Sequence, residues 1–261
     1  MKAPQRRYEL SDDEWKCIAS YFPVRKTGIK GRPYNDVRTT VNGIIWIARS
    51  GAPWRDLPER YGKWNTVYKC FAKWQEQGVF EKVFHELRIE ADLQDISIDS
   101  TSCKAHQHSA GAKKRGPNSD VNEHIGISRG GKNTKVHAAV DALGYPLHVV
   151  LSGGNVHDSS VAIELLENTP VNRSVIMADK AYRGENIRTK IEDIGCTHCI
   201  PPQSNDKIQW EVDWWQYKER SNVECFFQKL KQYRRIATRY EKLAVRFLGF
   251  VHMCCALIWL K

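Results

Sequence analysis

The stretch DISIDST, residues 95–101, marks the point at which the chain changes from helical to strand-like patterning. Ile96 and Ile98 alternate with polar residues, which places both on one face of a strand. Residues before this stretch carry apolar side chains at helical spacing, whereas short apolar runs follow it. The sequence therefore predicts a helical domain over residues 1–92 and a second, α/β domain over residues 93–261.

The segments after DISIDST predict the order of elements in the second domain. Residues 134–154 predict two strands around a turn at 143–146, whereas residues 103–133 show no apolar period and predict a long loop. Helix, strand, helix, strand and helix then alternate, in the segments HDSSVAIELLE (157–167), SVIMAD (174–179), GENIRTKIEDIG (184–195), CTHCI (196–200) and YKERSNVECFFQKLK (217–231). This is the element order of the ribonuclease H-like fold, a mixed five-stranded sheet with flanking helices.

The N-terminal domain shows the start signals of several short helices. Ser11 precedes one helix with Glu14 three residues on, which is the capping-box spacing, and Asp36 can cap a second. A third helix over about residues 64–75 places Lys69 and Lys73 away from its apolar side chains. Short helices with tight breaks are compatible with a helix-turn-helix that binds DNA, and equally with any small helical domain.

Three acidic residues stand where the predicted elements bring them together. Asp99 ends the apolar run of the first strand, Asp179 ends the fourth strand, and Glu224 lies on the late helix. In a ribonuclease H-like sheet the first and fourth strands are neighbours and the last helix packs across them. Three converging carboxylates repel one another unless a divalent cation sits among them, and their hard oxygen atoms suit Mg²⁺ or Mn²⁺.

Each of these acids also has a simpler explanation. Asp99 can cap a turn, Asp179 can begin a loop, and Glu224 can pair with Arg220 four residues earlier. Asp158 is expected to cap the helix that follows it, with His157 as a neighbour of that cap and not a catalytic base.

The late helix carries a polar stripe beside an apolar face. At 100° per residue, Tyr217, Arg220, Glu224 and Lys231 fall within an arc of about 60° and span roughly 21 Å. The adjoining apolar face consists of Val223, Phe226, Phe227, Leu230 and Tyr233. A solvated face explains such a stripe as well as a functional one does.

Composition favours a polyanionic partner. The chain of 261 residues has a net charge of +10 and a pI of about 9.2. No apolar run is long enough to span a membrane, and the start MKAPQRRYEL lacks the apolar core of a signal peptide, so a cytoplasmic protein with reduced thiols is expected. The pair Cys196 and Cys199 lacks the second pair that a zinc site requires, and a short strand explains it better.

Positive charge is concentrated in two segments. Residues 103–135 hold seven Lys or Arg against two acids, and residues 214–246 hold nine against three. The segments GAKKRGPN (111–118) and SRGGKN (128–133) are predicted to be flexible loops that bind DNA phosphates, unless they are ordinary surface loops. The residues expected to make these contacts are Lys113, Lys114, Arg115, Arg129 and Lys132.

The motifs together resemble those of bacterial insertion-sequence transposases with an Asp-Asp-Glu triad. The stripe matches the Y-x₂-R-x₃-E-x₆-K signature of the insertion-sequence-five-like group at every spacing, and IDST (98–101) and ADKAY (178–182) are similar to its two aspartate motifs. The resemblance extends to the N-terminal stretches GRPYNDVR, SGAPWRDLP and YGKWNTVYKCFAKW. Arg183 and Cys70 depart from the group, where an acid and an arginine are common; both departures bear on DNA contacts and leave the triad intact.

The resemblance implies a transposase that binds the terminal inverted repeats of its element and cuts and joins DNA with bound Mg²⁺, for which Mn²⁺ would substitute. Asp99, Asp179 and Glu224 would be the catalytic, metal-binding residues. Arg220 and Lys231 would contact phosphates, and Tyr217 would pack at a base or sugar. Double-stranded DNA of transposon ends and target, a homodimer that synapses two ends, and a location at the bacterial nucleoid are implied as well.

Two other hypotheses fit parts of the sequence. A repressor derived from a transposase would bind DNA without cutting it, but the intact triad argues against it. A ribonuclease or junction nuclease of the same fold would lack the N-terminal helices and the Tyr-Arg-Glu-Lys signature.

Overall fold

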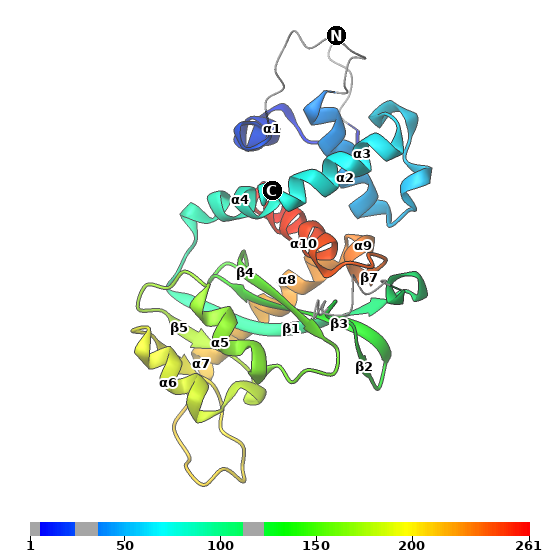
Figure 1. Cartoon of the computed structure of the whole chain (residues 1–261). Helices are drawn as coiled ribbons and strands as arrows, with labels where there is room; N and C mark the ends of the chain where they lie inside the picture. The colour runs from blue at the N-terminus through cyan, green and yellow to red at the C-terminus, as the bar shows by residue number, and fades with distance from the viewer. Residues whose placement is uncertain (1–5, 24–35, 112–122) are drawn as a thin grey trace.

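The computed structural model describes residues 6–23, 36–111 and 123–261, and Figure 1 shows its layers. The N-terminal part is helical, as predicted, and contains α1 (Asp12–Ile18), α2 (Val37–Ser50), α3 (Trp64–Glu76) and α4 (Val79–Leu87). The apolar helix α10 (Ala244–Trp259) lies between these helices and the sheet (Figure 1). Short 3₁₀ turns occupy Ala19–Tyr21, Trp54–Asp56, Glu59–Tyr61, Arg88–Glu90, Gln107–Ala110, Lys180–Tyr182 and Lys218–Arg220.

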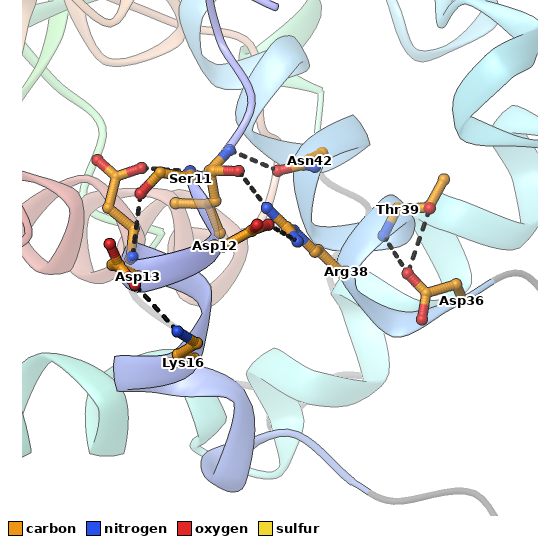
Figure 2. A network of polar contacts seen from close by, with 10 residues as sticks. Ser11, Asp12, Asp13, Lys16, Asp36, Arg38, Thr39 and Asn42 are labelled. Atoms are coloured by element: carbon orange, nitrogen blue, oxygen red, sulfur yellow. Dashed lines mark hydrogen bonds and ion pairs between the residues drawn. The ribbon is translucent and has the colours of Figure 1, made fainter. Parts of the chain in front are cut away.

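The first two helices begin as their sequences predict. The Ser11 hydroxyl accepts the Glu14 N–H at 3.1 Å, while the Glu14 carboxylate accepts the Ser11 N–H at 2.7 Å, so the capping box is complete. Asp36 caps α2 by accepting the Thr39 N–H, and Gly51, with a φ of +70°, ends that helix in the left-handed conformation. Figure 2 shows these caps and the polar contacts that join the two helices.

The sheet has the strand order of the ribonuclease H-like fold. An antiparallel meander of β1, β3 and β4 is followed by β5 and β6, which add parallel strands on the other side of β1. The first and fourth predicted strands are therefore neighbours, as expected. The bounds are β1 (Asp95–Ala105), β2 (Gly126–Ser128), β3 (Gly131–Val140), β4 (Pro146–Gly153), β5 (Val175–Met177), β6 (Thr197–Cys199) and β7 (Thr238–Arg239).

The sheet has seven strands, so the prediction of five is wrong. The two additional strands, β2 and β7, are two or three residues long and pair with β3 and with the end of β1. The prediction of a loop over residues 103–133 is also partly wrong, since β1 extends to Ala105 and β2 and β3 form a hairpin around Arg129 and Gly130. Backbone hydrogen bonds hold these strands in the sheet. Their sequences show no alternation of apolar and polar residues, so a sequence pattern could not reveal them.

Helices cover both faces of the sheet. Ile96 and Ile98 face α5 (Ser159–Glu167) and α6 (Glu185–Asp193) in one apolar cluster. The opposite face, which includes Cys103, packs against the late helices and against the N-terminal helices. The stacked rings of Phe71 on α3 and Phe250 on α10, 4.4 Å apart, belong to this second cluster. The division of the chain at residue 92 stays a prediction, and helices from both sides of it share this core.

The late polar stripe lies on consecutive helical segments, not on the single helix predicted. α7 (Trp214–Tyr217) leads through the 3₁₀ turn Lys218–Arg220 into α8 (Ser221–Lys231), and α9 (Arg234–Ala237) follows. The predicted apolar face is confirmed, since its five members are at most 6% exposed. The tighter 3₁₀ turn changes the angular phase of Tyr217 relative to Glu224.

Across the described part of the chain, every helix is too short or too polar to cross a membrane.

Removal of the Phe71 ring should destabilise the whole molecule. We expect Phe71→Ala to lower the free energy of unfolding by about 3–5 kcal/mol, because it empties a buried site against Phe250. Lys69→Ala, an exposed change on the same helix, should stay within about 0.5 kcal/mol. Urea unfolding followed by tryptophan fluorescence and circular dichroism measures both. Two separate transitions, with only one of them shifted, would contradict the shared core.

Candidate active site

The register between β1 and β5 brings two predicted carboxylates level with each other. The strands run parallel, and the last pair in their ladder is Ser97 with Met177. Continued by two residues, the same register sets Asp99 beside Asp179, which directly follows the end of β5. Neighbouring strands lie about 4.7–4.9 Å apart. Both aspartates therefore project from adjacent backbones at one level of the sheet.

Arg220 connects the first aspartate to the glutamate of α8. Its Nη1 donates to Asp99 Oδ2 at 3.0 Å, and its Nη2 donates to Glu224 Oε1 at 2.5 Å. The side chains of Arg220 and Asp99 are about one-fifth exposed, whereas that of Glu224 is 53% exposed. The expected Arg220–Glu224 pair is present, but the same guanidinium also holds Asp99, so this part of the stripe is more than a solvated face.

Asp99 lies in an environment rich in negative charge. Burial raises its pKa, and the carboxylates of Asp179 and Asp158 raise it further, whereas the Ser100 N–H and the Arg220 guanidinium lower it. Several carboxylates thus act on one another, with the Arg220 guanidinium bound to Asp99 and the Lys135 ammonium bound to Asp158. Such a group of anions favours the approach of a further cation.

Asp158 does not cap α5, so that prediction is wrong. It stands at the N-cap position, directly before the first residue of the helix, but its side chain makes no capping hydrogen bond, and its Oδ1 accepts the Lys135 Nζ at 2.7 Å. Lys135 also donates to the Val156 carbonyl at 2.8 Å. His157 lies beside the start of the helix, as expected, with its Nδ1 2.7 Å from the Ser159 hydroxyl; that it is not a catalytic base stays a prediction.

Tyr182 is a neighbour of the carboxylates that sequence reasoning missed. The residue is 1% exposed, and its hydroxyl has no hydrogen-bond partner among the described residues. Burial raises the pKa of Tyr182, and the charges of Asp158, Asp99 and Asp179 raise it further. It is the tyrosine of ADKAY, and an aromatic residue in an otherwise polar turn was the available signal.

The two ends of the stripe differ in their surroundings. Tyr217 lies against Arg220, whose Cζ is 5.9 Å from the ring centroid, and against the ring of Trp214. Burial raises the pKa of Tyr217, and the charge of Asp179 adds to the rise. Lys231 is partly exposed and forms no ion pair within the described ranges. Its charge lowers the pKa of the buried Cys103 thiol on β1, against the rise that burial causes.

The predicted phosphate-binding loops have different outcomes. Lys113, Lys114 and Arg115 lie outside the described residues. Arg129 and Lys132 are exposed on the β2–β3 hairpin, so SRGGKN is part of an ordered hairpin and not the flexible loop that was predicted.

Several cations of the second basic segment serve the fold. Arg235 forms a buried pair with Glu241 at 2.6 Å, with both side chains less than 10% exposed. Arg239 is fully buried and donates to the Thr134 hydroxyl, while Arg246 pairs with Glu76 on α3. The charge count over residues 214–246 therefore overstates the cations that this segment presents at the surface.

Comparisons with known proteins assign the family. Residues 10–84 match a family model described as "Putative transposase of IS4/5 family", and residues 90–210 and 176–261 match two models described as "Transposase DDE domain". The Brucella ovis protein named "Putative transposase for insertion sequence element IS6501" is 43% identical over 129 residues, which are 49% of this chain and 98% of that protein.

Two further matches are more distant. The Burkholderia cepacia protein named "Putative transposase for insertion sequence element IS402" is 27% identical over 57% of this chain and 70% of its own length. A solved piggyBac transposase synaptic complex with hairpin DNA aligns with 92% of this chain and 69% of its own at 11% identity, with a TM-score of 0.49.

The match to nearly the full length of the Brucella ovis protein, together with the domain models on both halves of the chain, confirms the expected resemblance. This enzyme belongs to the DDE transposases of bacterial insertion sequences.

Proposed function

We propose that this transposase binds the terminal inverted repeats of its insertion sequence, cuts the DNA there, and joins the freed 3′ hydroxyl to target DNA. Asp99, Asp179 and Glu224 would be the catalytic residues. The observation that carries the proposal is the register of β1 with β5, which when continued sets Asp99 on β1 level with Asp179 two residues after β5, with Glu224 tied to Asp99 through Arg220.

The donor atoms fit a divalent cation such as Mg²⁺, with Mn²⁺ as a substitute. All three side chains offer hard carboxylate oxygens. In the described parts of the chain no three His, Cys, Asp or Glu side chains are gathered closely enough to hold one ion, and Arg220 stands between Asp99 and Glu224. The guanidinium thus occupies the position of a cation, and its release would leave carboxylates in need of another. A bound divalent ion supplies activation of the attacking oxygen and stabilisation of the leaving 3′ oxygen.

The side chains along the stripe would position DNA. Arg220, once free of the carboxylates, would reach a phosphate near the scissile bond, and the partly exposed Lys231 would contact another further along the strand. Tyr217 would pack at a base or sugar. Arg129 and Lys132 on the hairpin, with Lys113, Lys114 and Arg115, would contribute phosphate contacts that do not depend on sequence.

The remaining parts of the proposal concern assembly. The N-terminal helices would recognise the end sequence, and two copies of the chain would synapse two ends. The two-copy assembly follows from the need to bring two ends together before joining them to a target.

Glu224→Gln should separate chemistry from binding. The change keeps size and removes a charged ligand, so nicking of a labelled terminal fragment with Mg²⁺ should fall by several orders of magnitude. Binding to the same fragment should persist or tighten, because a negative charge near phosphate is lost. Glu219→Gln, an exposed acid on the adjoining turn, is the matched control and should cut normally. Wild-type nicking by Glu224→Gln would refute the assignment of the triad.

Lys231→Gln should weaken binding through one phosphate contact. In gel shifts at several salt concentrations, the slope of log affinity against log salt should shrink by about 0.9. Cleavage should remain measurable at high protein concentration. Arg173→Gln removes an exposed cation on the connection before β5 and should leave the slope unchanged. If the slope of log affinity against log salt were the same for the two variants, Lys231 would not contact the DNA.

Arg220→Gln should increase the affinity for Mn²⁺ in the absence of DNA. The guanidinium competes with an added cation for Asp99 and Glu224, so its loss should tighten Mn²⁺ binding measured by calorimetry. In EDTA the melting temperature should fall, because the partly buried Asp99 loses its counter-ion. Weaker Mn²⁺ binding by the variant would show that Arg220 organises the carboxylates and does not compete for them.

A further inference from the structure

A cavity of about 540 Å³ opens on the other flank of α8, away from the catalytic carboxylates. It lies where the segment before α1, the helix α2, the C-terminal end of α8 and the end of α10 meet. From the late helices it is lined by Lys229, Gln232 and Tyr233, and by no member of the polar stripe. Small-molecule sites typically measure about 300–1,000 Å³, so the cavity can hold a ligand of that size.

The cavity is lined by more cations than free acids. Arg7, Arg49, Lys229 and Lys261 line it, and within the described ranges none of them forms an ion pair. The two carboxylates on its wall are engaged elsewhere: that of Glu14 accepts the N–H that begins α1, and that of Glu9 accepts the Tyr61 hydroxyl at 3.0 Å. The unpaired positive charge indicates an anionic ligand.

A buried hydroxyl on the cavity wall lacks an acceptor for its proton. Tyr233 is 1% exposed, and its hydroxyl has the donor Arg49 beside it but no acceptor among the described residues. Arg49 lies over the face of the same ring, with its Cζ 3.6 Å from the ring centroid. A buried polar group without a partner is unfavourable, so a ligand oxygen that accepted this hydroxyl would complete the site.

Aromatic rings line the cavity together with the cations. Tyr145 lines the cavity and stacks on Trp259, with ring centroids 4.6 Å apart. The Lys229 Nζ lies 5.6 Å from the Tyr145 ring centroid. Cations beside flat rings match a ligand that carries both a phosphate and a planar base, because bases stack on aromatic faces while phosphates bind cations.

The wall that carries Arg7 is fixed to α2. The Leu10 N–H donates to Asn42 Oδ1 at 3.0 Å, and the Leu10 carbonyl accepts from Arg38 Nη2 at 2.7 Å. Arg38 also pairs with Asp12 at the start of α1 (Figure 2). These contacts hold the cavity open before a ligand arrives, which lowers the entropy cost of binding.

We propose that this cavity binds a nucleotide, with its phosphate held by Arg49, Lys229 and the Tyr233 hydroxyl and its base against the Tyr145 ring. The nucleotide is either free in solution or an unpaired nucleotide of a DNA strand. The site is separate from the proposed cleavage chemistry, since it lies on the other flank of α8.

The test is calorimetric titration of the full chain with dAMP, with a short 5′-phosphorylated single strand, and with inorganic phosphate. We expect dAMP to bind and phosphate alone to bind at least tenfold more weakly. A strand that binds and is displaced by dAMP identifies unpaired DNA as the source, and a strand that fails to bind while dAMP binds identifies the free nucleotide. No binding of dAMP, or equal binding of phosphate, overturns the proposal.

Variants distinguish a binding role from a structural one. Tyr233→Phe should weaken dAMP binding about tenfold while the melting temperature stays the same or rises, because the lost hydroxyl has no acceptor for its proton among the described residues. Arg49→Gln should weaken binding at least as much, whereas Arg173→Gln should bind as the unmodified chain does. A Tyr233→Phe protein that melts lower and binds dAMP normally would show that the hydroxyl is structural and overturn the proposal.

Discussion

The parallel pairing of β1 with β5 is the constraint on which the site depends. It is only a few residues long, yet it sets the level of Asp99 and Asp179, and a slip of one residue would turn one of them to the opposite face of the sheet. Two flanks hold this register: the long antiparallel ladder of β1 with β3, and the apolar cluster in which Ile96 and Ile98 face α5 and α6. The position of the carboxylates is therefore a consequence of packing on the far side of the sheet.

The buried face of α8 supplies the third position. Val223, Phe226 and Leu230 are fully buried, which fixes the rotation of the helix and sends Glu224 to its exposed flank. Arg220 precedes the helix on a 3₁₀ turn and reaches Asp99 as well as Glu224. Because one guanidinium links a strand to a helix, like charges are tolerated near a partly buried carboxylate.

Local patterns in the sequence predicted the elements that bury an apolar face and the acids at their ends. The alternation around Ile96, the capping box of Ser11 and the apolar face of α8 all have short-range causes, and each is confirmed. The predictions that failed concern strands and side chains that pair with residues far away in the sequence. β7 exists because it pairs with the end of β1, more than a hundred residues away. Likewise Asp158 meets Lys135 across the fold instead of capping its own helix, and Arg239 is buried by groups from distant segments.

The buried face of α8 orients residues at both ends of the helix, and these residues belong to two different sites. Near its start, the phase set by the buried face directs Glu224 to the flank where Arg220 binds it together with Asp99. Near its end, the same phase directs Lys229 to the opposite flank, where the helix meets Tyr145 and the segment before α1. Any change that rotates α8 would therefore move the carboxylate and the cavity wall together. A substitution in its buried face would affect both sites, whereas substitutions on either flank can be made independently, because the core that fixes the helix is left intact.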